Sequence, residues 1–139
     1  MGYANTQIAI QTYVPSDDVL INNAANKAGN SDDPVFNKIK EITLGSTIGS
    51  SSLFRFKFIL SRSGGTARGR IYRNGSAIGT EQTVGGAPTE FTEDIVSTTW
   101  VESDTVELWV RITGAPSVTP YGSDFRICGI GSEWINTVV

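Results

Sequence analysis

The stretch LFRFKFIL, residues 53–60, is the clearest fold signal, because a large apolar residue stands at every second position and Arg55 and Lys57 lie between them. Successive side chains of an extended chain point to opposite faces. One face takes the large apolar residues Phe54, Phe56, Phe58 and Leu60. The stretch TVELWVRI, residues 105–112, repeats this period, and we expect Glu107, Trp109 and Arg111 to point outward. Such strands are typical of antiparallel sheets with one face against a core and the other in water.

A second fold signal is the dipeptide Asn74-Gly75, which lies within IYRNGSAIGTEQT, residues 71–83. Asn-Gly favours the two-residue type I′ turn, in which both residues take positive φ and the strands keep their twist. We therefore expect a hairpin here. Weaker patterns predict strands at 6–13, 18–22, 35–44, 67–73, 76–84, 89–97 and 124–130, with a tail at 134–139. The chain should form about eight or nine strands in all.

An apolar face on each sheet has to be covered, so two sheets packed on one another are the simplest arrangement. The sequence predicts an all-β, antiparallel two-sheet sandwich with jelly-roll or Greek-key connections. Its 139 residues are enough for a single domain with a core of its own. We expect the core at 35–139, preceded at 1–34 by a more polar N-terminal arm and the first strands. That arm either pairs with a neighbouring subunit or forms an edge strand of its own domain.

The chain has one cysteine and no histidine, which excludes a disulfide framework, a Cys-rich zinc site and imidazole chemistry. The strongest catalytic pattern is a set of carboxylates, because paired carboxylates hydrolyse glycosides. The set consists of Glu90, Glu93, Asp94, Glu102, Asp104 and Glu107. Spacing alone shows no pair, and solvation or pairing with basic strands explains these residues better. We predict no enzyme, no catalytic or metal-binding residue and no cofactor.

Basic residues gather in one part of the chain, where six of the eleven Lys and Arg residues occur. They are Arg55, Lys57, Arg62, Arg68, Arg70 and Arg73. A cationic sheet face with Tyr72 as a stacking ring would suit nucleic acid. Because the net charge is −3, we instead expect acidic neighbours such as Glu90, Asp94 and Glu107 to neutralise the face. Nucleic acid is therefore not a predicted partner, and no apolar run is long enough to predict a membrane span.

Aromatic and basic side chains on the outer strands are the candidates for contact with a ligand or a partner protein. They are Trp100, Trp109, Tyr121, Tyr72, Arg68, Arg70 and Trp134. A glycan-binding protein would need Trp100, Trp109 and Tyr121 in one groove, since sugars stack on aromatic rings. An interface between subunits would use the same residue types. The sequence leaves both uses open.

Residues 38–129 carry a recurring set of motifs: KIKEITLG, FRFKFIL, GRIYRNGSAIGTEQT, FTEDI, Trp100, DTVELWVRI and DFRICG. In this order they resemble small β-sandwich modules of uncharacterised phage and archaeal-virus virion proteins, of the fibre or head-decoration type. The resemblance implies a structural virion protein, a capsid decoration or a fibre or spike component. Such a protein would form homo-oligomers, bind other virion or surface proteins, and assemble in the host cytoplasm.

Two other functions are compatible with the same sequence. One is a carbohydrate-binding module or adhesin, which would have a glycan as its partner. The other is a surface filament subunit whose chains are joined by strand exchange. Either alternative would place the protein at a cell surface instead of in a virion. The motifs of the resemblance are fold motifs, and a fold does not by itself define a function.

Overall fold

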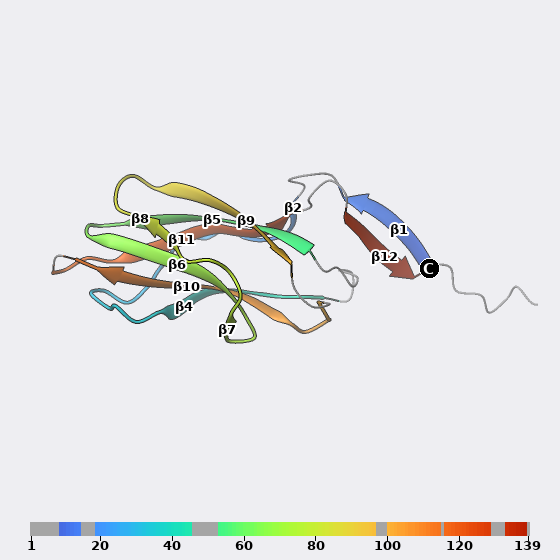
Figure 1. Ribbon diagram of the computed structural model, residues 1–139, viewed down its shortest axis with the longest axis horizontal. Coiled ribbons are helices and arrows are strands. Elements are labelled where there is room, and N and C mark those ends of the chain that lie inside the picture. Colours follow the sequence, from blue (N-terminus) through green and yellow to red (C-terminus); the bar gives the residue numbers. More distant parts are fainter. Residues whose placement is uncertain are drawn as a thin grey trace, which may run out of the picture.

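The computed structural model describes residues 9–14, 19–45, 53–96, 100–114, 116–128 and 133–138. Within these residues every regular element is a β-strand. Two antiparallel sheets pack against one another, and a third, two-stranded sheet lies beyond one end of them (Figure 1). The predicted all-β sandwich is therefore confirmed.

The first sheet of the sandwich has the order β2-β11-β5-β9, with β3 also paired to β11. Its strands are β2 (Val19–Asn23), β3 (Lys27–Ala28), β5 (Leu53–Arg62), β9 (Thr89–Val96) and β11 (Pro120–Cys128). The second sheet has the order β4-β10-β6, and both β7 and β8 pair with β6. Its strands are β4 (Asn37–Thr43), β6 (Thr66–Arg73), β7 (Ser76–Ala77), β8 (Gln82–Val84) and β10 (Thr105–Thr113). The third sheet pairs β1 (Ala9–Val14) with β12 (Glu133–Val138).

The strand pairs are nested along the chain, so that each pair encloses the next pair in sequence. β1 pairs with β12, β2 with β11, β4 with β10, β5 with β9, and β6 with β8. In the sandwich, the pair β2·β11 lies beside β5·β9, and β4·β10 lies beside β6·β8. This arrangement of eight main strands in two sheets is the jelly-roll topology.

The alternating pattern at 53–60 puts its aromatic side chains into the core, as predicted. Phe56, Phe58 and Leu60 have no exposed surface, and Phe54 is 2 % exposed. From the facing sheet, β10 contributes the even-numbered apolar residues of 105–112, which are also buried. Burying a large apolar side chain contributes about 1.5–3 kcal/mol. The two alternating stretches therefore supply much of the interface between the sheets.

Strand β11 begins earlier than the sequence indicates, at Pro120 instead of Asp124. The reason is Gly122, which resembles a turn residue but lies in the middle of the strand. A Cβ atom at Gly122 would lie 2.7 Å from Ile39 Cδ1 and 2.8 Å from Leu108 Cδ2 of the opposite sheet. Glycine here permits close approach of the two sheets.

The expected strand 76–84 is interrupted between β7 and β8. The backbone N–H groups of Ile78 and Gly79 both donate to the carbonyl of Ile71, at 3.0 Å each. A Cβ atom at Gly79 would lie 2.6 Å from Glu93 Oε1 of the other sheet. Glycine at position 79 therefore permits the close approach of this bend to Glu93 of β9.

Residues 19–34 of the predicted arm are built into the sandwich, since β2 and β3 pair with β11. Strand β1 pairs with β12 of its own chain. The structure thus shows β1 paired within its own chain, in a sheet separate from the sandwich, and a pairing of the arm with a neighbouring subunit stays a prediction. Residues 1–8 and 15–18, and the expected strand start at Thr6, lie outside the described residues.

The two open sides of the sandwich each carry an inward-pointing charged residue on an edge strand. On β4, Lys40 is 4 % exposed and its Nζ donates to Asn23 Oδ1 of the other sheet at 2.9 Å. On β9, Glu93 accepts the N–H of Thr80 with both carboxylate oxygens, at 3.1 and 2.9 Å. Burial, together with the charge of Lys27, lowers the pKa of Lys40. Inward charges on edge strands oppose the addition of another strand.

Candidate functional site

The outer face of β6 and β10 carries a set of half-buried aromatic and arginine side chains, which we call the aromatic–arginine face. It comprises Phe36, Arg68, Arg70, Tyr72, Trp109 and Arg111. The antiparallel register sets Trp109 opposite Arg70, and Arg111 opposite Arg68. Because side chains alternate along a strand, these residues share the face that points away from the core.

The rings of this face are held in fixed positions by one another. Tyr72 and Trp109 stack at 4.5 Å between ring centroids, with an angle of 16° between their planes. Phe36 lies 6.2 Å from Tyr72 in a tilted arrangement. The Trp109 indole donates from Nε1 to Glu107 Oε1 at 2.9 Å. Offset stacking of this kind adds about 0.5–1.5 kcal/mol per pair beyond the burial of area.

The arginines of the face are also held. Arg68 and Arg111 both contact Glu81 Oε1, at 3.0 and 2.8 Å. The guanidinium of Arg111 lies 5.1 Å from the centroid of the Phe36 ring. Arg70 donates to the carbonyl of Gly79. The face is therefore ordered before any partner binds, which lowers the entropic cost of binding.

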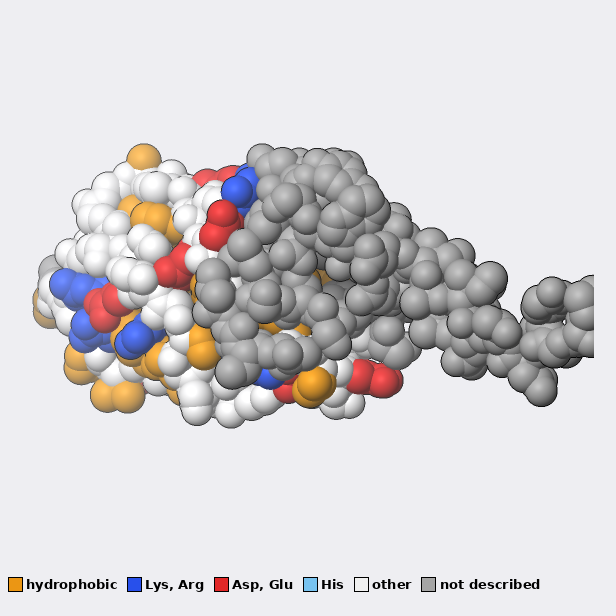
Figure 2. All heavy atoms as spheres, turned by 45° about the vertical axis from the view of Figure 1, so that its right-hand side comes forward, with side chains coloured by type: hydrophobic (Ala, Val, Ile, Leu, Met, Phe, Trp, Pro, Cys, Tyr) orange, Lys and Arg blue, Asp and Glu red, His pale blue; other side chains and the backbone are white. Residues whose placement is uncertain are grey.

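Charge on the outer faces is largely compensated, as the sequence indicates. Arg55 pairs with Asp94 at 2.8 Å across β5 and β9, and Arg126 pairs with Glu90 at 3.1 Å. Figure 2 shows Lys and Arg side chains beside Asp and Glu side chains on the face in view, instead of one patch of a single sign. Glu107 differs from the expectation, because it is buried and accepts from Trp109 and Thr105 instead of pairing with a basic strand.

The structure brings together four of the seven predicted contact residues: Arg68, Arg70, Tyr72 and Trp109. Tyr121 lies apart from them, on β11 of the other sheet. Its neighbour Gly122 packs into the core, so alternation directs Tyr121 to the opposite outer face. Trp134 belongs to β12, whose side chains are outside the described residues. No groove can therefore combine Trp109 with Tyr121.

Trp100 is a core residue, and its assignment as a contact residue is corrected here. Its side chain is 1 % exposed and packs 5.4 Å from Phe54 and 5.9 Å from Phe56, between ring centroids. The guanidinium of Arg73 covers the ring at 4.4 Å from its centroid. Sequence alone does not distinguish such a tryptophan from an exposed one, because it precedes the strand and shares no alternating pattern.

Phe36 and Arg111 belong to the aromatic–arginine face, and Glu81 pairs with its arginines, although none of the three is among the contact residues predicted from the sequence. Phe36 precedes β4 and Glu81 precedes β8, so neither lies within a regular strand. Their place on the face follows from long-range packing against β6 and β10. Arg111 follows Trp109 by two positions on β10, so alternation along the strand is the one sequence signal that places Arg111 on the same outer face.

Five of the six carboxylates of the acidic set contact hydrogen-bond donors or arginines among the described residues. Asp104 is 6 % exposed and accepts from Arg73 Nη2 at 2.6 Å, from Asn74 Nδ2 at 2.9 Å and from the Val101 N–H at 3.0 Å. Glu90, Glu93, Asp94 and Glu107 have the separate partners given above, and Glu102 is exposed. Each of these contacts stabilises the fold. The absence of enzymatic activity stays a prediction.

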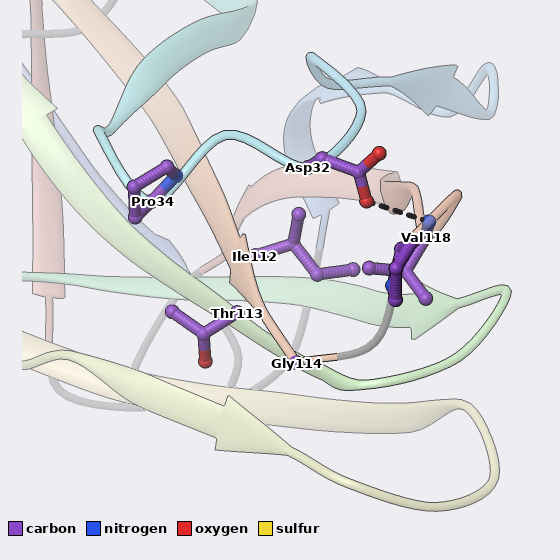
Figure 3. A pocket seen from close by; sticks show the side chains of 7 residues that line it. Asp32, Pro34, Ile112, Thr113, Gly114 and Val118 are labelled. Atoms are coloured by element: carbon purple, nitrogen blue, oxygen red, sulfur yellow. Dashed lines mark hydrogen bonds between the residues drawn. The ribbon is translucent and has the colours of Figure 1, made fainter.

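A shallow hollow of about 450 Å³ lies at the end of the sandwich shown in Figure 3. It is lined by Asp32, Pro34, Ile112, Thr113, Gly114, Pro116 and Val118. The carboxylate of Asp32 already accepts the N–H groups of Ser117 and Val118, both at 2.9 Å. Figure 3 shows the bond to Val118. Its remaining lining is mainly apolar, and the carboxylate is used to hold the loop 116–118. This hollow does not bring polar groups together for catalysis.

No protein-family model, curated protein or solved structure matches the chain. Among the described residues, no group of three or more Cys, Asp or Glu side chains is placed to hold a metal ion. The described part of the chain also contains no helix of the length and hydropathy needed to cross a membrane.

Proposed function

We propose that the protein is a structural component of a virion, either a capsid decoration or a part of a fibre or spike. In this proposal the aromatic–arginine face binds a neighbouring protein subunit of the particle. The jelly-roll topology supports the proposal at the level of the fold, because viral capsid proteins use it widely. Lectins use it as well, so the topology alone does not decide between them.

The observation that carries the proposal is the preordered aromatic–arginine face. Tyr, Trp and Arg are the residues that most often dominate the energy of protein interfaces. Here Tyr72 and Trp109 stack on one another, so each has at least one ring face already covered. A sugar needs a free ring face, and the stacking leaves each of these rings one such face at most, whereas a protein surface can also pack against ring edges and guanidinium groups. The arrangement therefore suits a protein partner better than a glycan.

The inward charges at the open sides of the sandwich support the same mode of assembly. Lys40 on β4 and Glu93 on β9 point inward and bridge to the opposite sheet. Strand exchange at these edges would have to displace both contacts. A filament joined through the edges of the sandwich is therefore the weaker alternative, and contact through an outer sheet face is the stronger one.

Mass spectrometry of particles released by the cells that encode the chain tests its place in a virion. We expect the protein to copurify with the particles, and to do so less when Trp109→Ala removes the stacked indole. Tyr121→Ala is the matched control, because Tyr121 is a half-exposed aromatic residue on the opposite outer face. Absence of the wild-type protein from the particles would contradict the proposal. Equal retention of both variants would contradict the role of the face.

Glycan binding is the second candidate, and the proximity of Arg70 to the rings of Tyr72 and Trp109 is the observation that favours it. An adhesin at a cell surface would use the same face. Titration with a panel of glycans, monitored by tryptophan fluorescence, distinguishes the two proposals. A saturable change that Arg70→Ala abolishes while Trp109 remains as the reporter, in a protein absent from particles, would favour the adhesin.

A further inference from the structure

The two-stranded sheet β1·β12 is the part of the described structure that pairs with no further strand. Of the five nested strand pairs, four lie side by side in the sandwich and so complete two larger sheets. The fifth pair, β1·β12, forms a separate two-stranded sheet beyond the end of the sandwich (Figure 1). Among the described residues, each edge of this ribbon has unpaired backbone N–H and C=O groups. Isolated two-stranded sheets are marginally stable in water.

The edges of the ribbon also lack the protection that the edges of the sandwich have. β1 and β12 together read AIQTYV and EWINTV, with Glu133 as the one charged residue in twelve and with no proline or glycine. Strands of this composition pair readily with a further strand. The sandwich edges carry the inward charges of Lys40 and Glu93 and are poor partners for the ribbon. The ribbon of a second copy has the same nearly uncharged composition and the same unprotected edges.

We propose that β12 pairs with β12 of a second copy, so that two ribbons form a four-stranded antiparallel sheet about a two-fold axis. The sandwich itself suggests which edge is used. In the two pairs nested directly inside β1·β12, namely β2·β11 and β4·β10, the C-terminal strand is the inner one of its sheet, whereas in β5·β9 and β6·β8 the inner strand is the N-terminal one. The corresponding strand of the ribbon is β12. A two-fold contact of this type uses the same surface on both copies and closes to a dimer.

This dimer contact is separate from the aromatic–arginine face and does not depend on the proposed virion function. Ile135 and Asn136 are the middle residues of β12, so the two-fold axis would pass near them. Like charges placed opposite each other across paired strands repel. A charge introduced at Ile135 would therefore face its own copy, whereas a charge on β1 would lie on the far edge.

Sedimentation equilibrium of the full chain tests the contact. We expect a dimer that Ile135→Lys weakens by at least about tenfold in dissociation constant. Thr12→Lys is the matched control, because Thr12 is the cross-strand partner of Ile135, and it should change the constant by less than about threefold. A monomeric wild-type chain would overturn the proposal, and so would a dimer that Thr12→Lys disrupts and Ile135→Lys does not.

Hydrogen exchange gives a second measurement that needs no variant. The amides of residues 133–138 that point away from β1 should become protected as the protein concentration rises. Protection that is independent of concentration would contradict a contact between copies. Trp109→Ala should leave the dimer unchanged, so failure of the aromatic–arginine face and failure of the ribbon contact can be told apart.

Discussion

The guanidinium of Arg73 lies between the ring of Trp100 and the carboxylate of Asp104. It is 4.4 Å from the ring centroid, and its Nη2 is 2.6 Å from Asp104 Oδ2. Asn74 of the type I′ turn adds a further bond to Asp104 and accepts the N–H of Thr105 at 2.8 Å. The motif residues Arg73, Asn74, Trp100 and Asp104 thus form one structural clamp at the edge of the core.

Asp104→Asn should destabilise the protein by about 2–3 kcal/mol, because a buried carboxylate with charged and amide donors is lost. Urea unfolding, followed by tryptophan fluorescence, gives the free energy of unfolding. Asp94→Asn is the control, since the Asp94 side chain is 41 % exposed and its pair with Arg55 should contribute less than about 1 kcal/mol. Equal losses for the two variants would mean that the clamp is no more than a surface ion pair.

The clamp also predicts a dependence of stability on pH. Burial alone would raise the pKa of Asp104, but hydrogen bonds from Val101, Asn74 and Arg73 outweigh burial and lower it. The unfolded chain therefore binds this proton more readily than the folded chain. The contribution of Asp104 is complete above the unfolded pKa of about 3.9 and is lost as the pH falls through the lower, folded value. Urea titrations of the wild type and Asp104→Asn should converge below about pH 4, and a constant gap would refute the pKa shift.

Replacing Lys40, the inward-pointing lysine of β4, should leave the free energy of unfolding nearly unchanged but should promote association between copies. Lys40→Met removes a buried cation, so the free energy of unfolding should stay within about 1 kcal/mol of the wild type or rise. The unguarded edge should nevertheless associate, which light scattering after gel filtration would detect as higher-order species. Lys38→Met on the same strand is the control, because Lys38 points outward and is exposed. Unchanged association of Lys40→Met would show that the lysine does not protect the edge.

The turn at Asn74-Gly75 allows a test of backbone strain without steric interference. Gly75 has φ +81°, and a Cβ atom there would meet nothing within 4 Å among the described residues. Gly75→Ala should therefore cost about 1–2 kcal/mol from conformation alone. Gly86→Ala, at an equally open glycine without positive φ, should be nearly neutral. Thermal unfolding compares the two, and a neutral Gly75→Ala would argue against the type I′ turn.

The alternating patterns predicted the sandwich because each strand face is decided locally. Phe54, Phe56 and Phe58 are buried on the side that the period indicates, and the Asn74-Gly75 turn joins β6 to β7 as expected. The structure departs from the sequence-based prediction where contacts between residues distant in sequence determine the local conformation. Gly122 lies within a strand because Ile39 and Leu108 of the other sheet occupy the space of a side chain.

The candidate site was only partly predictable from sequence. Parity along β6 and β10 places Arg68, Arg70, Tyr72 and Trp109 on outer faces, but it does not show that the two strands are neighbours. Phe36 and Glu81 come from outside the strands, where no period exists. Trp100 shows the converse, since an aromatic residue in a connection can belong to the core.

Hydroxyl-radical footprinting of the free protein and of assembled particles tests most directly whether the aromatic–arginine face binds a neighbouring subunit. The oxidation rates of Tyr72 and Trp109 should fall on assembly, while that of Tyr121 on the opposite face stays unchanged. Equal oxidation of Tyr72 and Trp109 in both states would contradict the account, since the face would then be open to solvent in the particle.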